Sequence, residues 1–254
     1  MSDARNQFWH QDSAGILQSA DDGDNFGFAL AAGDFNGDGR ADLAVGVPFE
    51  DAGGVFDAGA VNVLYGSAGG LSASRNQIWH QESPGVADAA EFVDRFGSAL
   101  AAGDFDGHGG TDLAVGVPDE DLGSVVNSGA VNVLYAGADG LSASGNELWH
   151  QDSPGIADVA EDGDGFGLGA DAGDFNGGGG HADLVAGLAF EDVGVIPDGG
   201  AVNVLYGTGG GLSKGRDEFW NQDSPGVLDV AEGGDRFGST PRYFWQLTGP
   251  GRGF

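Results

Sequence analysis

The sequence predicts an all-β fold, a β-propeller built from four-stranded blades, and three observations lead to it. Phe-Gly pairs begin at Phe26, Phe96, Phe166 and Phe237, at steps of 70, 70 and 71 residues. Glycine supplies 51 of the 254 residues, which disfavours helices and suits short strands joined by tight turns. Each repeat also holds four segments of strand-like pattern. A four-stranded repeat is typical of a propeller blade, whereas solenoid repeats are shorter.

The first full repeat illustrates the four expected strands. The first strand leads into an Asp-rich loop, the second ends at Pro48, the third alternates apolar and polar residues, and the fourth carries Trp79. Alternation and turn-forming glycines are the signals of half-buried strands. A generic β-sandwich is the alternative, and the strict repeat argues against it. The expected strands are Ala29–Phe35, Leu43–Val47, Ala60–Tyr65 and Asn76–Gln81.

The repeat divides the chain into three full blades, 26–95, 96–165 and 166–236, with partial strands at both ends. Residues 1–25 read as the last strand and connector of a preceding blade, because Asn6–Ser13 copies the fourth-strand pattern. Residues 237–254 start another repeat and then depart from it at Thr240–Gln246. We interpret the chain as a truncated or frame-shifted piece of a longer propeller. A divergent closing strand that pairs with Asn6–Ser13 is the alternative.

Charge and composition exclude several function classes. Forty acidic residues against nine basic ones give a net charge of −31, which excludes a basic nucleic-acid footprint and disfavours anionic membranes. Without cysteine there is no disulfide framework, thiolate nucleophile or cysteine-ligated zinc. No apolar run approaches the roughly 18 residues of a membrane span, and no hydrophobic segment of a signal peptide follows Met1–Arg5. The acid excess fits a secreted or a salt-adapted protein.

The loop after the first strand has the pattern of a calcium site. Oxygen-bearing side chains stand at alternate positions, and Gly39 provides the turn that brings the later ligands around. Calcium accepts such a set more readily than magnesium, which demands tighter octahedral geometry. A solvated Asp/Asn/Gly turn is the alternative. The expected ligands are Asp34, Asn36, Asp38, the Arg40 backbone carbonyl and Asp42.

Two later loops repeat this pattern with changes. The second loop has His108 at the fifth position, and imidazole is a poor partner for a hard cation. The third loop has Gly178 at that position and one extra residue, so we expect it to bind metal less readily. The candidate ligands are Asp104, Asp106, His108 and Asp112 in the second loop, and Asp174, Asn176 and Asp183 in the third.

Other recurrent polar and aromatic residues have structural explanations. The pairs Glu50-Asp51, Glu120-Asp121 and Glu191-Asp192 are expected on a solvated face, with an acidic rim for a cationic partner as the alternative. A catalytic residue would not recur three times, so we expect structural roles for the histidines. The tryptophans are expected between neighbouring blades, with a sugar-stacking platform as the alternative. The histidines are His10, His80 and His150, and the tryptophans are Trp9, Trp79, Trp149 and Trp220.

These residues resemble a known family. The pair Phe26-Gly27, the loop Asp34–Asp42 and the following Gly46-Val47-Pro48 are similar to the FG-GAP repeat of integrin α-subunit propellers and bacterial repeat proteins. The third element has valine where the family has alanine. The resemblance implies a seven-bladed parent propeller, Ca²⁺ in the hairpin loops and an extracellular or cell-surface location.

The function that follows is a calcium-stabilised, non-catalytic propeller that acts as an extracellular protein-interaction or adhesion module. The chain carries no zinc-protease, nucleophile-elbow or P-loop motif. Two alternatives remain: an accessory propeller region of a larger secreted hydrolase, and a carbohydrate-binding, lectin-like propeller. The expected partner is a protein or a glycan, with no nucleic acid and no membrane insertion. Self-association through open blade edges is also an expectation.

Asp38→Ala tests the first loop. If Asp38 is a ligand, the substitution lowers the thermal unfolding temperature in calcium and changes it little in chelator, because only the metal-bound state loses a contact. An equal loss in both conditions contradicts a ligand role.

Overall fold

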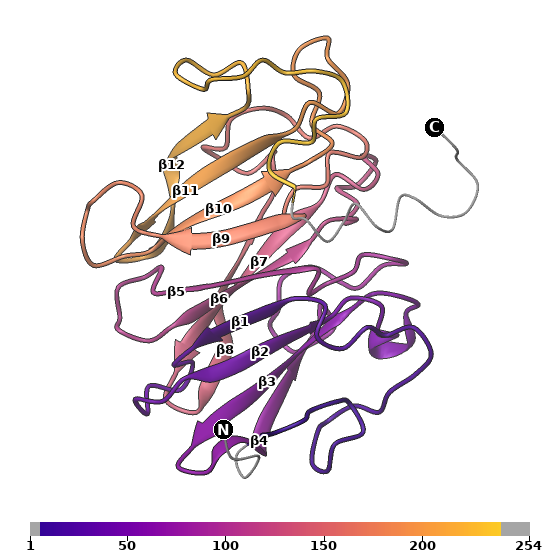
Figure 1. The fold of residues 1–254 in the computed structure, drawn as a ribbon, viewed down its shortest axis with the longest axis vertical. Coiled ribbons are helices and arrows are strands. Elements are labelled where there is room, and N and C mark those ends of the chain that lie inside the picture. Colours follow the sequence, from indigo (N-terminus) through magenta and orange to yellow (C-terminus); the bar gives the residue numbers. More distant parts are fainter. Residues whose placement is uncertain (1–5, 240–254) are drawn as a thin grey trace.

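The computed structural model describes residues 6–239, which form three antiparallel four-stranded sheets that follow one another in chain order along the long axis (Figure 1). Each sheet is a meander in which sequential strands pair. The fold class predicted from the sequence is confirmed: these are three blades of a β-propeller. The strands are β1 (Leu30–Gly33), β2 (Asp42–Val47), β3 (Ala60–Ser67) and β4 (Gly70–Trp79); β5 (Ala99–Gly103), β6 (Asp112–Val117), β7 (Ala130–Gly137) and β8 (Gly140–Trp149); and β9 (Gly169–Gly173), β10 (Asp183–Leu188), β11 (Ala201–Thr208) and β12 (Gly211–Trp220).

The fourth strand of each blade is longer than the sequence pattern suggested. The expected Asn76–Gln81 was wrong at its start, because β4 begins at Gly70 directly after a tight turn. Gly70 adopts a φ of +108° there, and the Ser67 hydroxyl donates to its carbonyl at 2.6 Å. A bulge between Val63 and Tyr65 shifts the register, which hides the simple alternation from a sequence reading. A short 3-10 turn, η2 (Ala52–Gly54), lies in the connector after β2.

The blades pack face to face, and their cores lie between neighbouring sheets. Strand β5, the first strand of the middle blade, contacts both β1 and β9 (Figure 1). Burying one large apolar side chain in such a core contributes about 1.5–3 kcal/mol. The core between the first and second blades includes Phe35, Val61, Val63, Phe96, Leu113 and Val115. The core between the second and third blades includes Phe105, Val131, Val133, Trp149, Phe166 and Leu184.

The Phe-Gly pairs join each blade to the one before it. Phe96 is fully buried, and its amide donates to the Ala58 carbonyl of the preceding connector at 2.8 Å. The Phe166 amide donates to the Ser128 carbonyl at 2.8 Å, and the Phe237 amide donates to the Gly199 carbonyl at 3.0 Å. Gly97 can follow Phe96 because its φ is +95°, in the left-handed region that glycine tolerates. The repeated Phe-Gly motif therefore joins neighbouring blades through a backbone hydrogen bond.

Two of the tryptophans lie where blades meet, as expected from the sequence. Trp149 is 2% exposed and belongs to the core between the second and third blades. Trp79 packs against the core between the first and second. Trp220, in the last described sheet, is 36% exposed. Trp149 is therefore buried in a core to which both its own blade and the next one contribute.

The N-terminal segment reproduces the contacts of a fourth strand without forming one. Gln7 Nε2 donates to the Leu71 carbonyl at 2.8 Å, and Leu71 N donates back to Gln7 Oε1 at 2.9 Å. Gln77 in β4 makes the matching contact with Leu141 of the next blade, at 3.0 Å. The divergent segment Thr240–Gln246 lies outside the described residues, so its interpretation stays a prediction.

Gly116→Ala tests the close packing between blades. A Cβ at Gly116 would collide with the Gly167 carbonyl oxygen of the next blade, so we expect a loss of about 1–3 kcal/mol in the free energy of unfolding. Urea unfolding measures it. Gly210→Ala is the matched control, because a Cβ there meets nothing within 4 Å. Equal stability of the two variants would contradict a steric role for Gly116.

Candidate metal centre

The loop between β5 and β6 gathers three carboxylates. One oxygen from each of Asp104, Asp106 and Asp112 lies within 4.8 Å of the others, and within residues 6–239 no other group of three acidic or metal-ligating side chains does so. Asp104 Oδ1 is buried and accepts no hydrogen bond, while its Oδ2 accepts the Gly109 amide at 3.0 Å. This buried carboxylate oxygen accepts no hydrogen bond and lies beside two more carboxylates. A cation bound there would neutralise their negative charge. The residues present therefore fit a hard metal ion.

Asp112 also holds the hairpin in place. It is 1% exposed, and its two oxygens accept the amides of Phe105 and Ala136, each at 2.8 Å. Ala136 belongs to β7, so this carboxylate ties the loop to the third strand. Burial, followed by the nearby Asp106 and Asp104 carboxylates, raises the pKa of Asp112 to about 6. Negative charge at this position is therefore costly unless a cation is close.

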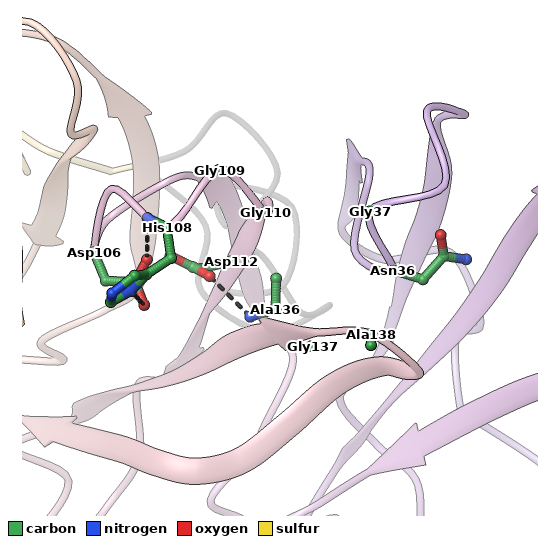
Figure 2. Close-up of a pocket in the computed structure, with 10 residues that line it drawn as sticks. All are labelled: Asn36, Gly37, Asp106, His108, Gly109, Gly110, Asp112, Ala136, Gly137 and Ala138. Carbon is green, nitrogen blue, oxygen red and sulfur yellow. Dashed lines mark hydrogen bonds and ion pairs between the residues drawn. The ribbon is translucent and has the colours of Figure 1, made fainter.

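His108 contacts one of these carboxylates and is exposed to solvent. Its Nδ1 lies 2.8 Å from Asp106 Oδ2, and its side chain is 75% exposed. The Asp106 carboxylate raises the pKa of His108. The loop borders a pocket of about 520 Å³ that Asn36 and Gly37 of the first loop also line (Figure 2). The imidazole thus pairs with one acid of the cluster and leaves the other two without a basic partner in the loop.

The first loop uses its oxygens differently. Asp34 accepts the amides of Asp38 at 3.0 Å and Gly39 at 2.7 Å, and Asn36 Oδ1 accepts the Asp38 amide at 2.9 Å. Asp38 pairs with the Arg40 guanidinium at 3.3 Å. The sequence pattern favoured this loop, whereas among residues 6–239 three carboxylates come together only in the second. The second loop has Asp106 where the first has the amide of Asn36, so the first loop holds only two carboxylates at the same three positions.

Asp42 and Asp183 repeat the anchoring role of Asp112. Asp42 accepts the amides of Phe35 at 2.9 Å and Gly66 at 2.7 Å. Burial raises the pKa of Asp42 as well. Asp183 accepts the amides of Phe175 at 2.8 Å and Gly207 at 3.0 Å. The last acid of each loop therefore has a structural role whether or not a metal is bound.

In the third loop, a neutral side-chain amide donates to the last aspartate. Asn176 Nδ2 donates to both oxygens of Asp183 at 3.0 Å, and Asn176 Oδ1 accepts the Gly178 amide at 2.6 Å. Asp174 accepts the amides of Gly178 and Gly179 at 3.1 and 3.3 Å. Both oxygens of Asp174 accept N–H groups, as those of Asp34 do in the first loop. The expectation that the third loop binds metal less readily stays a prediction.

A second set of acidic side chains is buried, contrary to the expectation from the sequence. The glutamates expected on a solvated face are buried, with 4% of Glu50, 1% of Glu120 and 3% of Glu191 exposed, so that expectation was wrong for them. A glutamine amide from the segment after each tryptophan donates to each glutamate: Gln11 to Glu50 at 2.8 Å, Gln81 to Glu120 at 2.5 Å and Gln151 to Glu191 at 2.7 Å. The constant spacing of 39, 39 and 40 residues was the available signal.

The buried glutamates hold protons strongly. Burial, and then the Asp94 and Asp88 carboxylates, raise the pKa of Glu120 to about 9. Burial, and then Asp164 and Asp158, raise the pKa of Glu191 to about 8. Both pKa values exceed the ordinary glutamate value of 4.5 because the ionised form loses hydration and faces other carboxylates.

The comparison with protein families agrees with this architecture. The model of the FG-GAP repeat matches residues 26–64 and 96–134. The chain contains FG-GAP repeats. Each matched FG-GAP segment runs from the Phe-Gly pair through the hairpin loop into the third strand of its blade. The matched segments therefore contain both structural features described above, the contact between blades and the acidic loop.

Curated relatives share these FG-GAP repeats over part of their length. Phosphatidylinositol-glycan-specific phospholipase D of Rattus norvegicus is 40% identical over 121 residues, 47% of this chain and 14% of that protein. Integrin alpha-PS2 of Drosophila melanogaster is 38% identical over 113 residues, 44% of this chain and 8% of that protein. Integrin alpha-3 of Cricetulus griseus is 30% identical over 147 residues, 56% of this chain and 12% of that protein. The chain spans 14% or less of the length of these relatives.

Among solved structures, Bacillus licheniformis rhamnogalacturonan lyase PL11 is similar over 78% of this chain and 35% of that one, with a TM-score of 0.43 and 13% identity. That similarity is too low to bear on function. None of the helices among residues 6–239 is long and apolar enough to cross a membrane.

The buried glutamates predict how stability depends on pH. In chelator, we expect the free energy of unfolding to rise as pH falls from about 8 to about 5, because the native state binds more protons than the unfolded state in that window. The folded pKa values of about 9 for Glu120 and about 8 for Glu191 both lie above the unfolded value. Urea unfolding at several pH values measures this, and Glu120→Gln should flatten the slope. Stability that rises with pH would contradict it.

Proposed function

We propose that this chain is part of a calcium-stabilised FG-GAP propeller that acts outside the cell as a non-catalytic protein-interaction module. The observation that carries the calcium proposal is the meeting of Asp104, Asp106 and Asp112 around a buried oxygen that accepts no hydrogen bond. These three carboxylates would hold the ion. Calcium supplies the positive charge that offsets their mutual repulsion.

The effect of such an ion is mechanical. Asp112 already connects the loop to Phe105 and to Ala136 in β7. A cation shared with Asp104 and Asp106 would fix both ends of the β5–β6 turn to that connection. Extracellular calcium modules bind at about 10⁻⁴–10⁻³ M, so a site of this kind fills outside cells and empties in cytosol.

The interaction role is supported by architecture and by relatives. The described blades present long connectors between β2 and β3 and between β4 and β5, and loops on a rigid scaffold are common binding surfaces. Two of the relatives are integrin α-subunits, and the shared segment is the repeat region. An extracellular or cell-surface location follows for this chain by the same similarity. The partner is a protein or a glycan.

A second candidate has a specific observation in its favour. The 40% identity to a phosphatidylinositol-glycan-specific phospholipase D covers only 14% of that enzyme, so the present chain corresponds to a small part of a much longer protein. An accessory region beside a hydrolase domain would be built from the same repeats. The sequence encoded on either side of this segment distinguishes the two candidates, since only the accessory region is adjacent to a catalytic domain.

Calcium titration of thermal unfolding tests the proposal. After exhaustive chelation, the unfolding temperature should climb with CaCl₂ and barely with MgCl₂. A ligand that binds only the native state adds about 2.7 kcal/mol at a hundredfold excess over its Kd. Asp104→Asn should remove most of the calcium response. Asp139→Asn is the matched control, because it removes the same charge from an exposed turn outside the cluster. An unfolding temperature that calcium does not move would sink the proposal.

A further inference from the structure

A second acidic cluster lies in the connector between the first and second blades, away from the hairpin loops. Glu120 is almost fully buried, and Gln81 Nε2 donates to its Oε2 at 2.5 Å. Its other oxygen, Oε1, is buried and has no hydrogen-bond donor. An ionised oxygen in that state costs several kcal/mol unless a proton or a cation neutralises it.

The side chains that approach Glu120 are acids. The Asp88 carboxyl lies within hydrogen-bonding reach of it, and Asp94, which is also buried, is close. Glu91 approaches Asp94 in turn. Arg95, the nearest basic residue along the connector, pairs with Asp119 at 2.9 Å. Because Asp88 is exposed, a small ion could reach the cluster from solvent.

In the first repeat, an amide takes the place of the acid beside the buried glutamate. Gln18 stands 70 residues before Asp88, at the equivalent position, and its Nε2 donates to Glu50 Oε1. Gln11 donates to the other oxygen of Glu50 at 2.8 Å. The buried glutamate of the first repeat therefore has a donor on each oxygen. The second repeat keeps the glutamate and replaces the second donor with a carboxylate.

The third repeat has an aspartate in the same place as the second. Asp158 stands at the position of Asp88, and its carboxyl lies within hydrogen-bonding reach of Glu191, which is buried and accepts Gln151 at 2.7 Å. Asp164, also buried, is the counterpart of Asp94. In the second and third repeats, the buried glutamate therefore faces an aspartate, whereas in the first repeat it faces the amide of Gln18.

We propose that a calcium ion takes the place of the Gln18 amide in these two repeats, held by Glu120 with Asp88 and by Glu191 with Asp158. The ligands are oxygen atoms of carboxylates, which suit a hard cation, and the open side at Asp88 leaves room for water to complete the shell. Each ion would bind the connector that leaves one blade to the glutamate after the second strand of the next. These sites are separate from the hairpin loops.

Counting bound calcium tests this inference. Equilibrium dialysis against about 10⁻³ M CaCl₂, with metal analysis, gives the number of ions per chain. Asp88→Gln, which copies the first repeat, should lower that number by one, and Asp158→Gln should do the same. Gln18→Asp should raise it by one, because it recreates the acid pair beside Glu50.

Thermal unfolding supplies a second readout. In chelator, Asp88→Gln should unfold at a higher temperature than the parent chain, because the acid pair is gone; saturating calcium should shrink or reverse that advantage. An unchanged ion count would overturn the inference. An advantage equal in calcium and in chelator would overturn it too, because it would show that the pair shares a proton instead of a metal.

The hairpin site is separable in the same experiment. Asp104→Asn should lower the count independently of Asp88→Gln. If Asp104→Asn lowers the count and Asp88→Gln does not, only this inference fails. If Asp88→Gln lowers it and Asp104→Asn does not, the calcium part of the proposed function fails while the connector sites stand.

Discussion

The structure depends on contact between blades, because a single four-stranded sheet cannot bury both of its faces. The apolar residues of each blade complete their burial only against the next one, as the contrast between Trp149 and Trp220 shows. That contact requires the backbones to approach closely, which glycine permits at Gly46, Gly116 and Gly187, where a Cβ would collide with the following blade. The unusual glycine content therefore reflects sheet stacking as much as turns.

Burial also explains how the acidic residues are divided. Most acids of this chain are solvated, but the last Asp of each hairpin loop and the Glu after each second strand are buried among backbone amides, glutamine amides and other acids. Negative charge in such places needs compensation. The repeats provide it in different ways: an amide from Gln18 or Asn176, an imidazole from His108, or, under the proposals above, calcium.

Much of this could be predicted from the sequence, and the reason is periodicity. The Phe-Gly pairs, the loops and the tryptophans locate the blades, because the same signal recurs at the same position in each repeat. The start of β4 was missed because a bulge interrupts the alternation. The burial of Glu120 was missed because one Glu-Asp pair holds a buried and a solvent-facing acid side by side. The three carboxylates of the second loop were visible in the sequence, because Asp106 stands where the first loop has Asn36. The imidazole of His108 at the fifth position directed the prediction to the first loop instead.

The Gln–Glu pairing has a consequence for how this chain can change in length. Each glutamine lies 39 or 40 residues before its glutamate, so it leaves one blade and reaches only the next, as do the Phe-Gly hydrogen bonds. No described contact of these two kinds skips a blade. Duplication or deletion of one whole repeat therefore leaves every remaining junction with its own complete set of partners. These two kinds of contact therefore place no limit of their own on the number of repeats.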